Sequence, residues 1–420
     1  MKKIVNMAIC AALTVSMLTG CGAVSAHSQN SSIQTSGDLV PVNTVATGEF
    51  DKSLMEFVEN AGYSDKSYMV SPTSFRAALA LAVAGADTET KEELIHAMGF
   101  NDMEEVNAWY ESVVKMVDDF NKDLDSDVKR FKADREYFGE DASAPEGKLT
   151  MLNSIWNNKD KNGKFGKKYK KYVKDNYSAE ANDVSSKDIT EKVDEWINKG
   201  TNGLIPSLEA DLSNANAVLV NTLYLKSSWV NSFEEYMTET GTFTTAKGEK
   251  VEKDFMSQTE YFQYYEDKNG KLVVLPLNGG VNAIFILGEV GDVHEAIKKA
   301  SSENVYVKIP KFDVESSFDE NQFIDFLVDR GAELAFTVDA DFSVMCPDTS
   351  WMISDIIQKT RVKIDEDGLE AAAATAIMML ESAMEVTEEP KEFIADQPFK
   401  FYICGGEDNT EVLFCGQIAE

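Results

Sequence analysis

The sequence predicts an α+β fold, with helices mostly in the N-terminal part of the chain and a large mixed β-sheet and further antiparallel sheets after them. Two observations carry this prediction. Apolar residues recur with helical spacing early in the chain, whereas many later segments are runs of β-branched and aromatic residues. Helices and strands also do not alternate as they do in βαβ units. With 420 residues and 43% hydrophobic residues, the chain can bury a large core.

Residues 1–20 are predicted to be a signal peptide. Lys2 and Lys3 form a positively charged start, and the apolar run over 4–18 is too short and wrongly flanked for a membrane span. We therefore expect export of the chain.

The end of this segment, Leu18-Thr19-Gly20-Cys21, resembles the lipobox of bacterial lipoproteins. The resemblance implies that Cys21 carries a lipid, which would tether the mature protein to the outside of a bacterial cell and be its one link to a membrane. The alternative is an ordinary signal peptide cleaved near 23–26, which would make the protein secreted. Residues 21–46 are rich in Ser, Gln, Asn and Thr and are expected to form a flexible stalk before a single domain over 47–420.

Helical patterns come first in that domain. Residues 54–61 and 74–85 have helical periodicity, and the second segment is apolar enough for burial. Ser71-Pro72 is a typical helix start, with proline in the first turn. Residues 88–94 are expected to form a capped amphipathic helix.

Two polar segments follow. Residues 118–148 contain three aspartates at the spacing of a calcium loop, Asp123, Asp125 and Asp127. Val128 occupies the position where such a loop needs glycine, so we expect a solvated helix or loop and no metal site. The basic run over 164–174 is expected to be a solvated helix face.

Strand patterns dominate the second half. Residues 217–229, 271–290 and 304–319 are β-branched, aromatic and mostly without helical periodicity. Residues 400–418 are expected to form a hairpin with a glycine-rich loop.

The charge balance excludes some partners. Asp and Glu number 72 against 40 Lys and Arg, which gives a net charge of -32. This field repels phosphate backbones and heparin-like polyanions, so we expect neither nucleic acid nor a heparin-like cofactor as a partner.

No residue pattern points to catalysis or to a bound cofactor. The sequence has no nucleophile elbow, zinc-protease helix, phosphate loop or dinucleotide fingerprint. Cys346, Cys404 and Cys415 have neither disulfide-framework nor metal-ligand spacing and are expected to be buried thiols. We therefore expect a protein that is not an enzyme and has no metal or cofactor.

Several segments, in order, resemble the serpin family of protease inhibitors. They are 69–94, 193–208, 218–233, 307–312, 341–345, 355–375 and 396–403. The resemblance covers about 47–420 and implies the serpin fold, a monomer, and an exposed reactive-centre loop over about 366–392. It also implies a suicide inhibitor: the protease cuts the loop, remains attached as an acyl-enzyme, and is trapped when the cut loop inserts into the large sheet.

The residues of the loop's hinge suit such an insertion. They are Glu366, Gly368, Leu369, Glu370, Ala371, Ala372, Ala373, Ala374 and Thr375. A segment that enters a packed sheet needs small, uncharged side chains on its inward face. With a period of two, Leu369, Ala371, Ala373 and Thr375 share one face, and Glu370 lies on the other. Gly368 gives the backbone freedom to bend where insertion begins.

The resemblance also implies which residues control insertion. Glu366 and Lys311 match a charged pair at the point of entry, with Trp229 packed beneath it. Ser71, Ser74 and Asn221 match polar residues where the strands of the sheet must part.

Two positions depart from the family pattern. Gln358 replaces the usual histidine, which removes any pH sensitivity that an imidazole would give. Leu369 replaces a smaller polar residue, and this bulk is expected to slow insertion without forbidding it.

Two counts locate the bond that the protease cuts. Counting from Gly368 gives Ser382-Ala383, whereas counting back from Pro398 gives a position near Thr387. We favour the first count, because the hinge sets the inserted length; the alternatives are Met379, Leu380, Met384 and Val386. The segment lacks Lys and Arg, so elastase-, subtilisin- or chymotrypsin-like serine proteases are expected targets, with papain-like cysteine proteases also open.

A second hypothesis from another class remains open, a non-inhibitory serpin-fold protein that binds a ligand or partner at the cell surface. Hinges of such proteins tend to be charged, proline-rich or bulky, and here only Leu369 leans that way.

Overall fold

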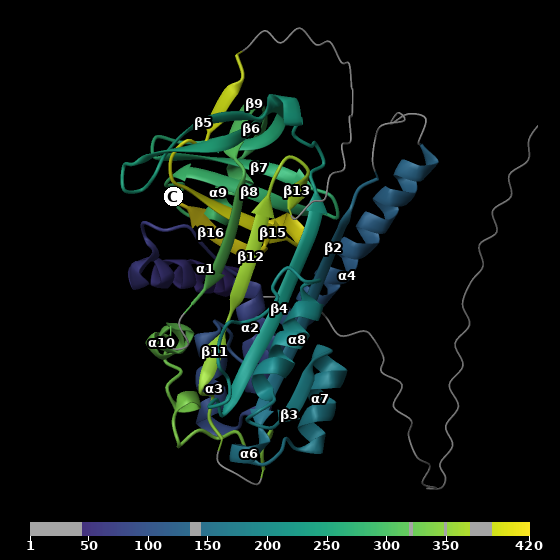
Figure 1. Ribbon diagram of the computed structural model, residues 1–420, viewed down its shortest axis with the longest axis vertical. Helices are drawn as coiled ribbons and strands as arrows, with labels where there is room; N and C mark the ends of the chain where they lie inside the picture. The colour runs from purple at the N-terminus through teal and green to yellow at the C-terminus, as the bar shows by residue number, and fades with distance from the viewer. Residues whose placement is uncertain (1–43, 135–143, 319–321, 348–350, 370–388) are drawn as a thin grey trace, which may run out of the picture. The chain divides into compact units, whose positions relative to one another are not determined.

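The computed structural model describes residues 44–134, 144–318, 322–347, 351–369 and 389–420 (Figure 1). The predicted signal peptide, Cys21, most of the predicted stalk, and the loop segment 370–388 lie outside the described residues. Within the described part of the chain, no helix is both long and apolar enough to cross a membrane.

Most helices of the described residues come before residue 201, and two more lie among the later strands. They are α1 (Thr44–Val58), α2 (Pro72–Gly85), α3 (Thr88–Ala97), α4 (Met103–Ala133), α6 (Lys159–Asn162), α7 (Lys167–Tyr177), α8 (Ile189–Gly200), α9 (Val293–Lys299) and α10 (Gln322–Asp329). α2 begins as the sequence predicts, because Ser71 caps it by accepting a hydrogen bond from the Ser74 backbone N–H, and Pro72 is its first residue. Every residue of α2 is buried, which explains its apolar composition.

Seven strands of the described chain form a mixed sheet, here called the large mixed sheet. Their order is β10 (Phe312–Ser317), β12 (Lys359–Ile364), β13 (Gly368–Leu369), β4 (Ala217–Ser228), β2 (Gly147–Asn158) and β3 (Glu180–Val184), with β11 (Asp355–Ile357) paired to β4. β11 with β4 and β2 with β3 are parallel pairs, and the other pairs are antiparallel. Figure 1 shows β4 running between β12 and β2.

Nine strands of the described residues form a second sheet. Their order is β1 (Tyr68–Val70), β16 (Glu411–Ile418), β15 (Phe399–Gly405), β8 (Val281–Gly288), β7 (Gly270–Leu277), β6 (Lys250–Glu266), β9 (Ser301–Pro310) and β14 (Lys391–Ile394), with β5 (Glu239–Thr244) paired to β6. Helix α2 contacts β4 of the large mixed sheet and β16 of the second sheet. The buried helix therefore joins the two sheets through a common core.

The predicted fold class is confirmed, with helices concentrated early and two large sheets. Cys346, Cys404 and Cys415 are buried thiols, as predicted. The polar segment after residue 118 is helical as far as Ala133, where α4 ends, and Gly147 then begins a strand.

The sequence did not predict β2 and β3, which lie among the early helices, or the long strand β6. β6 carries many charged and polar residues, and eight of its seventeen residues are exposed. Its apolar signal is therefore weak although its backbone pairs along both neighbouring strands.

Candidate functional site

The site begins with a two-residue strand in the middle of the large mixed sheet. β13 pairs with β12 on one side, where Leu369 lies opposite Ile364, and with β4 on the other, where Gly368 and Leu369 lie opposite Ser228 and Ser227. Leu369 is only 1% exposed and belongs to a buried hydrophobic cluster. The first residues of the predicted hinge are therefore already part of the sheet.

A tight turn brings Gly368 to this position. Asp365 and Gly368 exchange backbone hydrogen bonds of 3.1 and 3.3 Å. Gly368 has a φ of 147°, and a Cβ atom there would lie 2.2 Å from the Ser227 carbonyl oxygen. Any larger residue would collide with β4, so this close approach requires glycine.

Residues directly after β4 hold the turn from the other side. The indole N–H of Trp229 donates to the Asp365 carbonyl at 3.0 Å, and the Trp229 backbone N–H donates to the Asp367 carbonyl at 2.9 Å. The Phe233 N–H donates to the Glu366 carbonyl at 3.0 Å. Trp229 is only 2% exposed, and its ring packs beneath this turn, at the position that the family resemblance implies.

The predicted charged pair is brought together at the same place. Lys311 Nζ lies 2.8 Å from Glu366, and the Thr238 hydroxyl donates to the same carboxylate at 2.7 Å. Burial raises the pKa of Glu366, but the hydrogen bonds from Lys311 and Thr238 outweigh it, and the pKa lies below its ordinary value. The bond to Glu366 raises the pKa of Lys311. Both groups are therefore charged at neutral pH.

The predicted polar residues Ser71, Ser74 and Asn221 form a second group at the start of α2. Together with Asn153, Tyr110 and Gln358 they are here called the polar cluster. The Ser74 hydroxyl donates to the Asn221 side chain on β4, and the Asn221 amide donates to Asn153 on β2. Asn153 in turn donates to the Tyr110 hydroxyl at 2.7 Å. All three hydrogen bonds are buried, so breaking any one of them would leave a polar group without a partner in the core.

Gln358, which lies between β11 and β12, bonds to the same helix start. Its side-chain oxygen accepts from the Ser71 N–H and its amide donates to the Ser71 carbonyl, both at 2.9 Å. Because glutamine has both a donor and an acceptor, it satisfies two backbone groups of one residue. Ser71 and Ser74, one helical turn apart, thus bond to Gln358, between β11 and β12, and to Asn221 on β4.

Sequence reasoning missed Asn153, Tyr110 and Thr238. Asn153 carried a usable signal, because an asparagine inside a run that pairs as a central strand must find buried partners. Thr238 and Tyr110 carried none, since only the tertiary structure brings them to Glu366 and Asn153.

Several predicted residues lie outside the described residues. They are Cys21, the hinge residues Glu370, Ala371, Ala372, Ala373, Ala374 and Thr375, and the candidates for the cut bond Met379, Leu380, Ser382, Ala383, Met384 and Val386.

The arrangement is built from strand pairing and hydrogen bonds. It consists of a buried two-residue strand, a hydrogen-bonded turn, and ties from one helix to β4 and to Gln358, directly after the neighbouring strand β11. Such an arrangement can control whether the two strands separate.

Comparisons with known proteins agree with this geometry. The model of the family described as "Serpin (serine protease inhibitor)" matches residues 46–420. An uncharacterised serpin-like protein of Thermococcus kodakarensis is 29% identical, with 90% of this chain and 85% of that protein covered. An antichymotrypsin of Bombyx mori is 26% identical, with 81% and 89% covered. The crystal structure of a serpin from the insect Tenebrio molitor, described as highly specific, is 26% identical with a TM-score of 0.69, covering 90% of this chain and 97% of that one. This chain belongs to the serpin family.

Proposed function

We propose that this serpin is a suicide inhibitor of serine proteases, which traps the acyl-enzyme by inserting its cut loop into the large mixed sheet. The observation that carries the proposal is the position of β13. Leu369 already pairs with both β12 and β4, and Gly368 pairs with β4, all antiparallel. A cut loop that continues from Leu369 would extend a strand that has already begun.

The register of β13 determines how many residues of the loop could pair with β4. Leu369 lies opposite Ser227, so continuing the antiparallel pairing places Thr375 opposite Asn221 and Met379 opposite Ala217. Ala217 is the first residue of the twelve-residue strand β4. Full insertion would therefore use Gly368 to Met379, and the favoured bond, Ser382-Ala383, follows within a few residues.

The same register supports the facing predicted from the hinge sequence. Residues opposite each other in a sheet point to the same face, so Ala371 and Thr375 would lie on the face of Leu225 and Asn221. Leu225 and Asn221 are both largely buried. The small, uncharged side chains of the hinge suit this face, and Glu370 would point to the other.

Insertion needs β4 and β11 to separate. Val218 to Val220 pair with Asp355 to Ile357, and the polar cluster lies directly after this pairing. We infer that the hydrogen bonds from Ser71 to Gln358, directly after β11, and from Ser74 to Asn221 on β4 help to hold the uncut state as a kinetic trap.

A matched pair of loop variants tests the proposal. Wild type incubated with elastase should give an SDS-stable covalent complex. Ala373→Arg, on the inward face, should give cleaved product in place of complex, because insertion would bury a charge. Glu370→Arg, which exchanges one charge for another opposite the partly exposed Lys226, should still form complex. Clean cleavage of the wild type by elastase-, subtilisin-, chymotrypsin- and papain-like proteases alike would overturn the proposal.

Sequencing the N-terminus of the released fragment identifies the cut bond. The alternative hypothesis, a non-inhibitory binding protein, predicts no gain in thermal stability after loop cleavage. An inhibitor should gain stability sharply, because the inserted strand completes the sheet's backbone pairing.

We further propose that Cys21 is lipidated and tethers the inhibitor to the outside of a bacterial cell. The four residues that end in Cys21 support this proposal. Cys21→Ser should move the protein from the membrane fraction to the medium, and an unchanged distribution would contradict it.

A further inference from the structure

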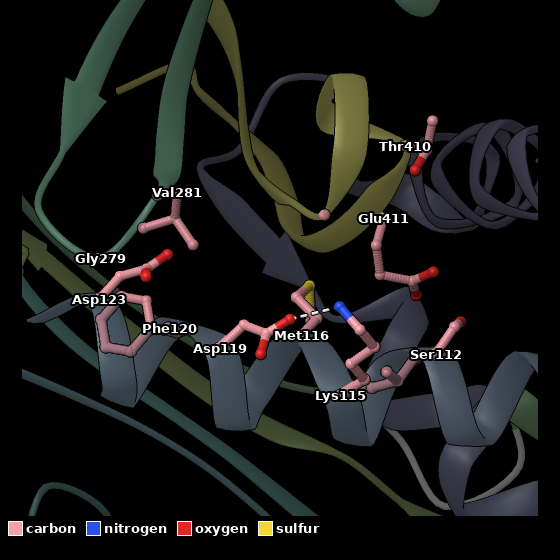
Figure 2. A pocket seen from close by; sticks show the side chains of 13 residues that line it. Ser112, Lys115, Met116, Asp119, Phe120, Asp123, Gly279, Val281, Thr410 and Glu411 are labelled. Atoms are coloured by element: carbon pink, nitrogen blue, oxygen red, sulfur yellow. Dashed lines mark hydrogen bonds and ion pairs between the residues drawn. The ribbon is translucent and has the colours of Figure 1, made fainter. Parts of the chain in front are cut away.

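A groove of about 370 Å³ lies beside α4, built by none of the residues of the hinge or the polar cluster (Figure 2). Its walls come from α4, from the turn between β7 and β8, and from the turn between β15 and β16. The lining residues on which the inference rests are Met116, Phe120, Asp123, Gly279, Val281 and Glu411. Its volume falls in the range of small-molecule sites.

Glycines bring the two turns close enough to form the groove. Gly279 has a φ of 81°, and a Cβ atom there would lie 2.6 Å from the Phe120 ring. A Cβ atom on Gly405 would lie 2.7 Å from the Met116 sulfur. The side chains of Met116, Phe120 and Val281 consequently form an apolar floor.

The groove is elongated. Its lining residues on α4 run from Ser112 to Asp123, which spans about 16 Å at the helical rise per residue. Figure 2 shows Asp123 and Val281 toward one end and Thr410 and Glu411 toward the other, with Met116 between them.

Each end of the groove carries a carboxylate. Asp123 is exposed and makes no ion pair with any residue that the structure describes. Glu411 accepts hydrogen bonds from Trp109, at 3.1 Å, and from Thr73, and it lies 3.7 Å from Arg76.

Glu411 keeps room for a further donor despite these partners. Arg76 also bonds to Asp51, so its guanidinium divides its donors between two carboxyl groups. A carboxylate has about four acceptor positions, which leaves Glu411 room for a donor from the groove. The lysine of the lining, Lys115, is bonded to Asp119 in the middle of the groove.

We propose that this groove binds a linear aliphatic diamine or polyamine. The two terminal ammonium groups bind Asp123 and Glu411, and the methylene segments cover Met116, Phe120 and Val281. The inner ammonium group of a polyamine lies beside Asp119, midway along the groove. The net charge of -32 favours the approach of such a cation. Anionic ligands are repelled from both ends, and neutral chains of the same length lack the charge that the ends recognise. The proposal stands independently of protease inhibition.

Spermidine is the probe, titrated calorimetrically into the mature chain. Asp123→Asn should weaken binding about tenfold, the effect of losing one charge-assisted contact. Asp125→Asn is the matched control, because it makes the same charge change on an exposed residue of the same helix outside the groove. Its affinity should equal that of the wild type. Equal weakening in both variants would mean attraction to the overall charge only and would overturn the proposal, as would no weakening in either.

Two further experiments test whether the ligand must be cationic and whether it covers Met116. Octanediol and suberate, neutral and anionic chains, should not bind. Met116→Arg places a tethered cation in the groove and should abolish spermidine binding while the circular dichroism spectrum is retained. A folded Met116→Arg chain that binds spermidine as the wild type does would contradict the assigned site. If this variant does not fold, the comparison of Asp123→Asn with Asp125→Asn still decides.

Discussion

Leu369 pairs with Ile364 across the turn that follows β12, and it does so in the interior of the large mixed sheet. Both residues are 1% exposed. The sequence led us to expect that the bulk of Leu369 slows the first step of loop insertion. In the structure Leu369 is already paired with both neighbouring strands and buried, so we expect its bulk to stabilise the resting state.

Substituting Leu369 should separate its stabilising role from the insertion step. Leu369→Ala should lower the stability of the uncut chain by about 2–5 kcal/mol, because it leaves a cavity in the core. The ratio of covalent complex to cleaved product should stay near that of the wild type, since Leu369 occupies the same place before and after insertion. Leu369→Arg should shift that ratio toward cleaved product. Thermal unfolding and gel densitometry measure the two effects, and an unchanged unfolding midpoint for Leu369→Ala would contradict the buried position.

The ion pair between Lys311 and Glu366 should contribute modestly to stability. Glu366→Gln should lower the free energy of unfolding by about 1–2 kcal/mol, because the carboxylate accepts charged and hydroxyl donors, while Lys311 remains partly solvated. Since the pKa of Glu366 is lowered from 4.5, its contribution is present above that pH and is lost as the pH falls through the folded value.

The unfolding midpoints of the wild type and Glu366→Gln, compared at about pH 7 and about pH 4, test this dependence. The difference should shrink at the lower pH. A constant difference would show that the charge of Glu366 is not what stabilises the turn. Glu260→Gln, on an exposed position of β6, is the control for a general loss of negative charge.

Gln358 should be a strong determinant of the uncut state. Gln358→Ala leaves the buried Ser71 N–H without its partner and removes a second bond at the Ser71 carbonyl, which also accepts from Phe75. The expected cost is about 1–3 kcal/mol. Because these bonds tie the segment between β11 and β12 to the start of α2, the variant should also lose inhibitory activity faster on warming. Gln263→Ala, an exposed glutamine of β6, should change neither quantity.

Asp51 should make stability fall as the pH rises toward neutrality. Burial, partly offset by Arg76 and reinforced by Glu411, raises the pKa of Asp51 from 3.8 to about 7. The folded chain therefore holds a proton that the unfolded chain releases, so this contribution is complete below the unfolded pKa and is lost as the pH rises through about 7. Unfolding midpoints measured across this interval should decline more steeply for the wild type than for Asp51→Asn. Parallel pH profiles would contradict the raised pKa.

The sequence predicted the hinge and its surroundings residue by residue, because the family motifs and the small side chains are both local features. Gly368 and the pair formed by Glu366 and Lys311 could be identified from the sequence and the family resemblance. The partners Thr238, Asn153 and Tyr110 could not be found in this way. Each of them lies more than forty residues from its bonding partner along the chain.

The groove beside α4 illustrates the same limit. The spacing of Asp123, Asp125 and Asp127 drew attention to that segment, and the missing glycine excluded a calcium loop. Only the fold places Asp123 in a groove and leaves Asp125 outside it, because α4 turns these two residues in different directions.

By itself, the sequence determined the α+β class, the start of α2 and several strands of both sheets, since these depend on periodicity, caps and local composition. Tertiary structure alone decided that Leu369 lies inside the sheet, that Ser71 bonds to Gln358 while Ser74 bonds to Asn221 on β4, and that Glu411 faces a groove. The physical reason is that these features depend on contacts between distant segments. Such contacts form only when the free energy of packing the whole chain selects among many locally acceptable arrangements.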